Sequence, residues 1–240
     1  MAQAGKKVAL VTGASRGLGR AISEQLQRDK FYIIGVARPS SDLDALNDAL
    51  SDDGETWPVD ATSDAFLAKI ENLERLDVLV NNAGTNVPEP MTSVTDETLD
   101  RVLDLNVRAA FRIARSALTR MRSGASIVNM TSQMGHVGSP NRTVYCMTKH
   151  ALEGLTKAMA VELAPRQIRV NAVAPTFVET PMTAPMLNDP EFSAFVKRMI
   201  PLGQVAKPED VASAVSYLCS DGARMITGHS LLVDGGWTVQ

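Results

Sequence analysis

The segment Lys7–Gly19 of this 240-residue chain, KVALVTGASRGLG, decides the fold. Its first part, Lys7–Thr12, is a short run rich in apolar residues, as expected for a strand that is covered on both faces of a parallel sheet. Three glycines follow at once, and a helical pattern runs over Arg16–Asp29. A strand that passes into a helix through closely spaced glycines is typical of the first unit of an alternating α/β fold.

The three glycines of this turn also indicate a ligand. They let the backbone approach a pyrophosphate closely, while the helix N-terminus offers unpaired N–H groups. Their spacing, Gly-x3-Gly-x-Gly, differs from the commonest dinucleotide fingerprint, and no Lys-Ser/Thr pair follows as in a nucleoside triphosphate loop. We predict a dinucleotide site, although a purely structural strand–helix junction would show the same glycines. The residues predicted to bind the cofactor here are Gly13, Ser15, Arg16, Gly17, Leu18 and Gly19.

The rest of the chain repeats this alternation. Parallel strands joined by right-handed crossover helices make a doubly wound sheet. We therefore predict a single α/β domain over residues 1–240, with a Rossmann-type parallel sheet and helices on both faces. The expected strands are Lys7–Thr12, Phe31–Val36, Val78–Asn81, Ser126–Met130, Ile168–Val173, Ser230–Val233 and, more weakly, Thr56–Val59. The expected helices are Arg16–Asp29, Ser41–Ala49, Ser63–Glu71, Leu105–Met121, Thr143–Leu163 and Pro208–Leu218.

The composition excludes several classes of protein. A formal net charge of −3 lacks the basic excess of a nucleic-acid-binding surface. No run approaches the roughly 18 apolar residues that a bilayer-spanning helix needs, and the first residues do not resemble a signal peptide. The two cysteines, Cys146 and Cys219, form no disulfide framework and suggest a reducing compartment. We expect a cytoplasmic protein without a metal, a membrane partner or a nucleic-acid partner.

Residues 177–204 interrupt the alternation with several prolines and with apolar residues such as Met182, Phe192 and Phe195. The segment follows a predicted strand at the carboxyl edge of the sheet, where open α/β sheets bind ligands. Long irregular segments in compact domains are often covers of active sites. We predict a substrate lid, and the alternative is a surface loop with one helix.

The end of the second predicted strand indicates which dinucleotide binds. NAD-binding chains usually place Asp or Glu about 20 residues after the glycine turn, against the ribose 2′-hydroxyl. This chain has no acid there, and Arg38 stands beside the expected position, with Arg16 in the glycine turn. Guanidinium groups bind a phosphate through paired hydrogen bonds. The pattern favours NADP(H) over NAD(H), unless both arginines are merely solvated.

A second set of residues indicates acid–base chemistry. Tyr145 and Lys149 stand four residues apart in a predicted helix and share one face, although such a pair is also common on surfaces. A nearby ammonium is expected to lower the Tyr145 pKa from about 10 toward neutrality, which suits proton exchange with a substrate oxygen. Ser132, at the end of a strand, can hold that oxygen. Asn106 is expected to open the helix Leu105–Met121, where it either orders a proton-relaying water or bonds to backbone.

Together these residues resemble the short-chain dehydrogenase/reductase family, over essentially the whole chain. The motifs stand in the family's order and spacing: Thr12–Gly19, Asn81-Asn82-Ala83-Gly84, Asn106, Ser132, Tyr145/Lys149, Pro175-Thr176 and Val233–Gly236. The resemblance implies a nicotinamide-dependent oxidoreductase in which Tyr145 is the acid/base and Ser132 orients the substrate carbonyl. It further implies that Lys149 holds the nicotinamide ribose and tunes Tyr145, and that Asn106 supports the proton relay.

The resemblance also assigns the remaining cofactor contacts. Asp60, with Ala61, matches the position that contacts adenine, and Asn82, Ala83 and Gly84 match the segment on the adenosine side. The stretch that holds the nicotinamide amide is matched by Pro175, Thr176, Val178 and Thr180.

The motifs are most similar to those of NADP-dependent carbonyl and L-xylulose reductases. This implies a hydride transfer between NADP(H) and a small or sugar-like ketone or secondary alcohol. Gln133 and His136 follow Ser132 and are candidates for bonding a polyol, with Gln133 assigned to the substrate site, although each also suits an ordinary loop. A 3-oxoacyl-thioester reductase that acts on acyl carrier protein is an alternative, and a non-catalytic nucleotide sensor is an alternative of another class.

The long predicted helices Leu105–Met121 and Thr143–Leu163 predict self-association. Both carry apolar residues around most of their circumference, and one sheet covers only one face of each. The resemblance implies that two such helices form a shared four-helix contact, so we expect a homotetramer. The apolar C-terminal segment Trp237–Gln240 is expected to dock against another subunit.

Overall fold

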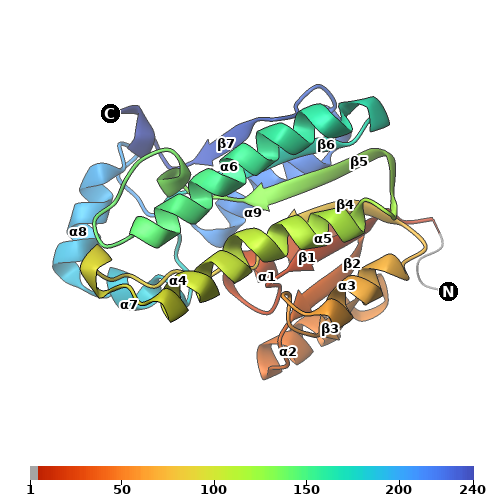
Figure 1. Cartoon of the computed structure of the whole chain (residues 1–240), viewed down its shortest axis with the longest axis horizontal. Helices are drawn as coiled ribbons and strands as arrows, with labels where there is room; N and C mark the ends of the chain where they lie inside the picture. The colour runs from red at the N-terminus through yellow and green to blue at the C-terminus, as the bar shows by residue number, and fades with distance from the viewer. Residues whose placement is uncertain (1–4) are drawn as a thin grey trace.

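A computed structural model of the chain describes residues 5–240 and shows the predicted seven-stranded parallel sheet, in the order β3-β2-β1-β4-β5-β6-β7 (Figure 1). All five residues of β1 are buried, because the sheet is covered on both faces. The strands are β1 (Val8–Thr12), β2 (Tyr32–Ala37), β3 (Gly54–Pro58), β4 (Leu76–Asn81), β5 (Met121–Met130), β6 (Arg169–Pro175) and β7 (Ser230–Val233).

Helices pack on both faces of this sheet, so the predicted layer order is confirmed. Figure 1 shows α5 and α6 in front of the strands and α1 and α9 behind them. Ile22, Leu46 and Val215 belong to one apolar core, and Phe66, Ile113 and Leu163 belong to the other. The helices are α1 (Gly17–Arg28), α2 (Ser41–Leu50), α3 (Asp64–Glu71), α4 (Asp96–Leu103), α5 (Ala109–Ala117), α6 (Thr143–Leu163), α7 (Ala184–Leu187), α8 (Pro190–Met199) and α9 (Pro208–Cys219). None of the helices that the structure describes is long and apolar enough to cross a membrane.

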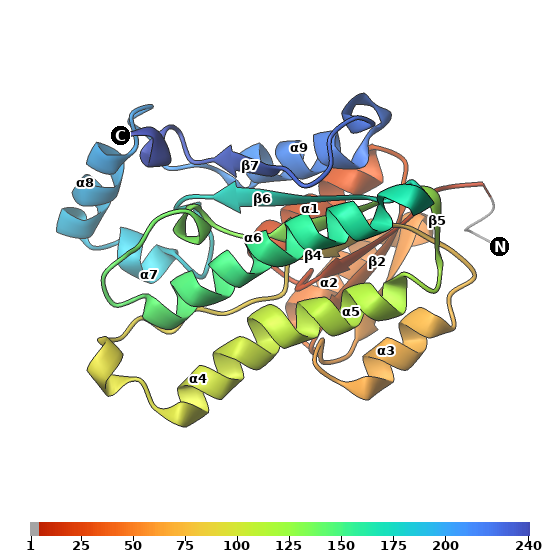
Figure 2. The same cartoon turned by 45° about the horizontal axis from the view of Figure 1, so that its top comes forward.

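The prediction of a helix over Leu105–Met121 is wrong at both ends. The helix begins earlier, at Asp96, and passes from α4 through a π-helical turn at Asp104–Arg108 into α5 (Figure 2). Its first turns bury only Val102, so they show little apolar periodicity. It ends at Ala117, and Met121 instead begins β5, where it pairs with Leu76 of β4.

Residues 177–204 contain two short helices, α7 and α8. The alternative to a lid, a surface loop with one helix, predicted only one of them. Figure 1 shows both helices beyond the arrowheads of the strands, at the carboxyl edge of the sheet. The segment packs on an apolar cluster that contains Met134, Phe177 and Ile200.

The C-terminal Trp237 packs against this same segment. Its ring lies 5.8 Å from that of Phe177 and 6.1 Å from that of Phe195, measured between centroids. Trp237 therefore makes apolar contacts within its own chain and stays only partly buried, and docking of Trp237–Gln240 against another subunit stays a prediction. Val239, two residues further on, is 81% exposed.

Candidate active site

The glycine turn is built against the end of β4. The Thr12 hydroxyl accepts hydrogen bonds from the backbone N–H groups of Asn82 and Ala83, both at 3.0 Å, and the Asn82 amide donates to the Thr12 carbonyl at 2.8 Å. A Cβ atom on Gly13, whose φ is +67°, would lie 3.1 Å from the Ala83 Cα, and one on Gly19 would lie 2.1 Å from the Gly13 carbonyl oxygen. Glycine is therefore required at both positions, and the turn leaves its backbone open to a ligand.

The two cations that the sequence singled out lie in the glycine turn, at the N-cap of α1, and directly after β2. Arg16 and Arg38 are both exposed, and neither makes a hydrogen bond or ion pair to any side chain in residues 5–240. Asp60 lies close to Arg38. Hydrogen bonds from the Thr62 backbone and hydroxyl, assisted by the Arg38 charge, hold the pKa of the Asp60 carboxyl below its usual range. Two free guanidinium groups at this edge suit an anionic ligand group.

Tyr145, Lys149 and Ser132 meet at the carboxyl ends of β5 and β6. The Lys149 Nζ donates to the Met130 carbonyl at 2.8 Å and lies 5.3 Å from the centre of the Tyr145 ring. The Ser132 hydroxyl bonds to the Tyr145 phenol and lies 3.4 Å from the Pro175 carbonyl oxygen. The structure thus brings together three residues that the sequence places on different elements.

Burial controls the protonation of this group. Burial raises the pKa of Tyr145 to about 12, against smaller opposing effects of the Ser132 hydrogen bond and the Arg142 charge. Burial also lowers the pKa of Lys149 to about 8, although the nearby Glu153 carboxylate opposes this change. The expectation that Lys149 lowers the Tyr145 pKa toward neutrality is wrong for the protein without its cofactor, because loss of hydration outweighs the effects of Ser132 and Arg142 that favour the phenolate. The phenol is a proton donor at neutral pH.

Asn106 lies inside the π-helical turn and does not open the helix. The wider turn directs its buried side chain toward the segment after β4. Its Oδ1 accepts from the Thr85 N–H and its Nδ2 donates to the Thr85 carbonyl, both at 2.8 Å, and Nδ2 also donates to the Thr148 hydroxyl at 3.1 Å. These bonds match the alternative in which Asn106 bonds to backbone, and its support of a proton-relaying water stays a prediction. A Cβ atom on Gly84 would lie only 3.8 Å from the Lys149 Nζ, so the hydrogen bonds of Asn106 to Thr85 hold the segment after β4 beside Lys149.

The predicted nicotinamide stretch lies beside both the glycine turn and Ser132. A Cβ atom on Gly17 would lie 3.5 Å from the Thr180 side chain. The Thr176 hydroxyl is buried and has no hydrogen-bond partner among residues 5–240. The unpaired Thr176 hydroxyl fits the amide of a nicotinamide, and the glycine turn, which has no side chains in the way, fits a pyrophosphate. The residues of this site therefore fit a nicotinamide dinucleotide.

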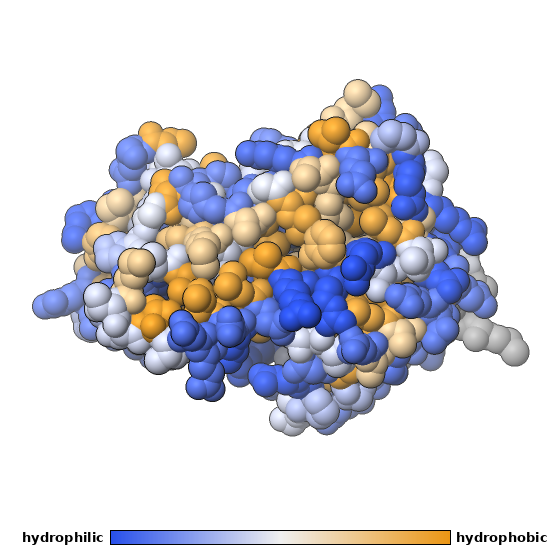
Figure 3. Space-filling model, in the orientation of Figure 1, coloured by the Kyte–Doolittle hydropathy of each residue, from blue (hydrophilic) through white to orange (hydrophobic). Residues whose placement is uncertain are grey.

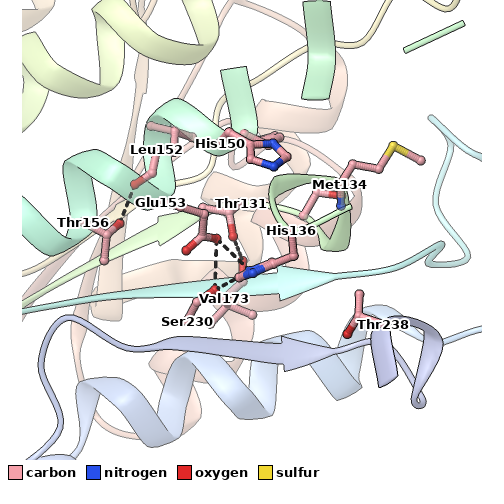
Figure 4. Close-up of polar contacts among 12 residues, drawn as sticks. Thr131, Met134, His136, His150, Leu152, Glu153, Thr156, Val173, Ser230 and Thr238 are labelled. Atoms are coloured by element: carbon pink, nitrogen blue, oxygen red, sulfur yellow. Dashed lines mark hydrogen bonds and ion pairs between the residues drawn. The ribbon is translucent and has the colours of Figure 1, made fainter. Parts of the chain in front are cut away.

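Gln133 and His136 have different surroundings. Gln133 is 1% exposed, and its Oε1 has no partner in the described part of the chain. His136 Nε2 lies 3.1 Å from the Ser230 hydroxyl and 3.2 Å from the Glu153 carboxylate, and Ser230 donates to that carboxylate at 2.9 Å (Figure 4). The imidazole therefore ties the turn after Ser132 to α6 and β7.

Glu153 was missed in the sequence. It is 5% exposed and sits one helical turn after Lys149, on the same face of α6. A carboxylate four residues after the lysine was the available signal, but it is indistinguishable from a solvated surface pair until its burial is known.

Comparisons with known proteins agree with this geometry. A family model described as enoyl-(acyl carrier protein) reductase, of the short-chain dehydrogenase/reductase type, matches residues 13–238. The L-xylulose reductase of Bos taurus is 41% identical over 234 residues, which cover 95% of each chain. The chain belongs to the short-chain dehydrogenase/reductase family. Its members among these relatives are oxidoreductases that act on alcohol and carbonyl groups.

Other members of the family are similar over nearly the full length. The D-erythrulose reductase of Gallus gallus is 38% identical and covers 96% of this chain, with 95% of its own length matched. A 3-oxoacyl-[acyl-carrier-protein] reductase of Rickettsia bellii is also 38% identical, with 96% of each chain covered. The crystal structure of a provisionally assigned NAD(P)-dependent gluconate 5-dehydrogenase from Beutenbergia cavernae, with NADP at low occupancy, has a TM-score of 0.93 and 34% identity, with 100% of this chain and 99% of the other covered.

The lowered Lys149 pKa predicts a pH-dependent stability of the cofactor-free protein. The folded chain releases this proton near pH 8, whereas the unfolded chain holds it to near 10.5, so the unfolded state binds more protons in between. The contribution of Lys149 to the free energy of unfolding therefore rises with pH across this interval. Lys149→Met should be more stable than the wild type at pH 7, and the difference should shrink by pH 9.5 in denaturant titrations.

The matched control for this prediction is Lys197→Met, at an exposed lysine on α8. It should show no such trend. A stability difference between Lys149→Met and the wild type that stays constant with pH would contradict the prediction.

Proposed function

We propose that the protein interconverts a ketone and a secondary alcohol with NADP(H), through the Ser132, Tyr145 and Lys149 group. The observation that carries the proposal is the convergence of this group with the glycine turn along one edge of the sheet, within an enzyme family of this activity. This proposal disfavours the non-catalytic sensor, because a protein that only binds the nucleotide has no need of a partly buried, protonated phenol beside a serine hydroxyl.

Each residue has a distinct proposed role. When bound, a reduced nicotinamide supplies the hydride. Tyr145, protonated at neutral pH, donates its proton to the substrate oxygen as negative charge develops there. The Ser132 hydroxyl, already bonded to the phenol, donates a hydrogen bond to the same oxygen. Lys149 binds the nicotinamide ribose, and Asn106 is a positioning residue that holds the Gly84 segment beside Lys149.

The proposed cofactor contacts follow the edge of the sheet. Arg16 and Arg38 bind the 2′-phosphate, which supports NADP(H), and solved relatives of the fold include one with bound NADP that has a TM-score of 0.91 and 30% identity. The remaining contacts are proposed for Gly13, Ser15, Gly17, Leu18, Gly19, Asp60, Ala61, Asn82, Ala83, Gly84, Pro175, Thr176, Val178 and Thr180.

The substrate is proposed to be a small, hydroxylated ketone, as the names of the xylulose and erythrulose reductases suggest. In this proposal the chain is one domain in which residues 177–204 are the lid, and Gln133 bonds a substrate hydroxyl through its free Oε1. A 3-oxoacyl thioester on an acidic carrier is the second candidate, supported by the Rickettsia relative and by exposed Lys197 and Arg198 on the lid helix α8. The free thiols of Cys146 and Cys219 support a cytoplasmic location.

Tyr145→Phe tests whether the protein is an enzyme of this kind. General acid catalysis is typically worth about 10²–10⁴-fold, so kcat for reduction of the best ketone should fall by at least about a hundredfold. The Kd for NADPH should change little, because Phe keeps the ring and its packing. A panel of ketoses, diketones and acetoacetyl thioesters with NADPH supplies the substrate.

Tyr217→Phe, at a tyrosine that is 47% exposed, is the matched control and should leave both quantities unchanged. A Tyr145→Phe protein that reduces its best ketone at the wild-type rate would remove the proposed mechanism.

Arg38→Asp tests the cofactor assignment. Loss of one charge-assisted hydrogen bond to phosphate weakens binding by about ten- to hundredfold, and the new carboxylate adds repulsion. The ratio of kcat/KM for NADPH over NADH should fall by at least that factor. Arg28→Asp, at an exposed arginine in the last turn of α1, should leave the ratio unchanged. A wild type that already prefers NADH would refute the role of Arg38.

A homotetramer is the proposed assembly. Figure 3 shows apolar side chains gathered in a band over α5 and α6. Phe111 on α5 is 50% exposed, and Met147 and Val161 on α6 are 46% and 79% exposed. Burial of such a band between two copies removes apolar surface from water. We expect a tetramer mass by light scattering at micromolar concentration and a smaller mass for Phe111→Glu, whereas a monomeric wild type would overturn the proposal.

A further inference from the structure

Arg142 is a buried cation without a counter-ion. It occupies the N-cap position of α6 and is only 8% exposed. Its Nη2 donates to the thioether of Met186 at 3.1 Å, and its Nη1 is buried with no hydrogen-bond partner in residues 5–240. A thioether is a weak acceptor, so the guanidinium is left with most of its hydrogen-bonding capacity unused.

Among residues 5–240, this guanidinium makes no ion pair, and the buried Glu89 Oε1 also has no hydrogen-bond partner. Met186 belongs to the apolar cluster that joins the lid to Tyr145 and Met134. Glu89 is near in the fold, because its N–H donates to the Asn141 carbonyl at 3.0 Å, but the described residues include no ion pair between it and Arg142. Burial lowers the Arg142 pKa. A buried charge without a partner is strongly destabilising, which indicates that the partner is a ligand.

The position of Arg142 connects it to the reacting group. It stands three residues before Tyr145, so the two side chains leave the first turn of α6 as neighbours. The Arg142 charge is close enough to Tyr145 to favour its phenolate. Through Met186 on α7, the guanidinium also contacts the lid. An anion bound to Arg142 would therefore have the lid residue Met186 and Tyr145 as neighbours.

We propose that Arg142 binds a carboxylate of the substrate, so that the enzyme acts on keto acids or hydroxy acids in which this carboxylate lies a few carbon atoms from the reacting carbonyl. The inference rests on the proposed function and deepens it by naming the substrate class. A carboxylate fits better than a phosphate monoester, because one guanidinium with an apolar flank matches one charge and two oxygens.

A purely structural role for Arg142 makes a different prediction. Replacement of an uncompensated buried charge by an apolar side chain of similar length is often neutral or stabilising. Arg142→Met should therefore have an equal or higher Tm without substrate, while losing the carboxylate site. A residue that only supports the fold would instead lower the Tm when it is replaced.

The test compares two matched ketones. 5-Oxogluconate and L-sorbose share their ketone and hydroxyl groups and differ at one end, where a carboxylate replaces a hydroxymethyl group. For the wild type with NADPH, kcat/KM should be at least tenfold higher for 5-oxogluconate. Arg142→Met should reduce that value by about ten- to hundredfold and leave L-sorbose within about threefold, whereas Arg142→Lys should recover part of the loss. Arg28→Gln, at the opposite edge of the sheet, is the matched control.

A phosphate arm separates the two anions. The same kcat/KM measurements are repeated with fructose 6-phosphate as the ketone. If Arg142→Met lowers kcat/KM more for fructose 6-phosphate than for 5-oxogluconate, the choice of a carboxylate is overturned.

A binding measurement tests the carboxylate site independently of the proposed reductase activity. Calorimetry of 5-oxogluconate into the protein saturated with NADP⁺ should show binding that Arg142→Met weakens by at least tenfold. If no ketone is reduced but this difference is present, the proposed function fails and the carboxylate site stands. If L-sorbose and 5-oxogluconate lose activity equally in Arg142→Met, or if 5-oxogluconate binds both proteins alike, the carboxylate site is refuted while the reductase activity stands.

Discussion

The hydrogen bond from the Lys149 ammonium to the Met130 carbonyl is the interaction on which the site depends. It joins the middle of α6 to the end of β5, and so sets the distance between the helix that carries Tyr145 and the turn that carries Ser132. Lys149 is buried, and this burial lowers its pKa. Desolvation is also the largest cause of the raised Tyr145 pKa, although the Tyr145 side chain is only partly buried.

Polar contacts around this bond hold the other segments in register. Asn106 fastens the chain after β4 to the π-helical turn, and the Thr12 hydroxyl fastens the glycine turn to the same segment. On the far side, Glu153 links His136 and Ser230 beneath Lys149. Each contact satisfies a buried polar group, so the edge of the sheet is rigid where chemistry is proposed. Arg142, Thr176 and Gln133 each keep a buried polar atom without a hydrogen-bond partner in residues 5–240.

Much of this arrangement follows from local patterns. Runs such as Lys7–Thr12 predict buried strands because a sheet covered on both faces needs apolar residues at every position. The glycine turn can be recognised in the sequence, because only glycine allows the close approach of residue 19 to the Gly13 carbonyl. The π-helical turn at Asn106 was not predictable, since the extra residue is accommodated by tertiary contacts to Thr85 and Thr148. Helix α8 and the position of Trp237 depend likewise on long-range packing.

The strands, most of the helices, the glycine turn and the family follow from the amino-acid sequence, because periodicity and motif spacing are local properties of the chain, whereas α4 and the two helices within residues 177–204 do not. Only the tertiary structure decided the charge states of the site. The sequence predicts that Lys149 lowers the pKa of the Tyr145 phenol. In the structure, desolvation raises the Tyr145 pKa and lowers the Lys149 pKa. Arg142 looks like any surface arginine in the sequence, and only the fold shows that it is buried without a partner. Hydration is lost through contacts between distant segments, so neither result is encoded in local spacing.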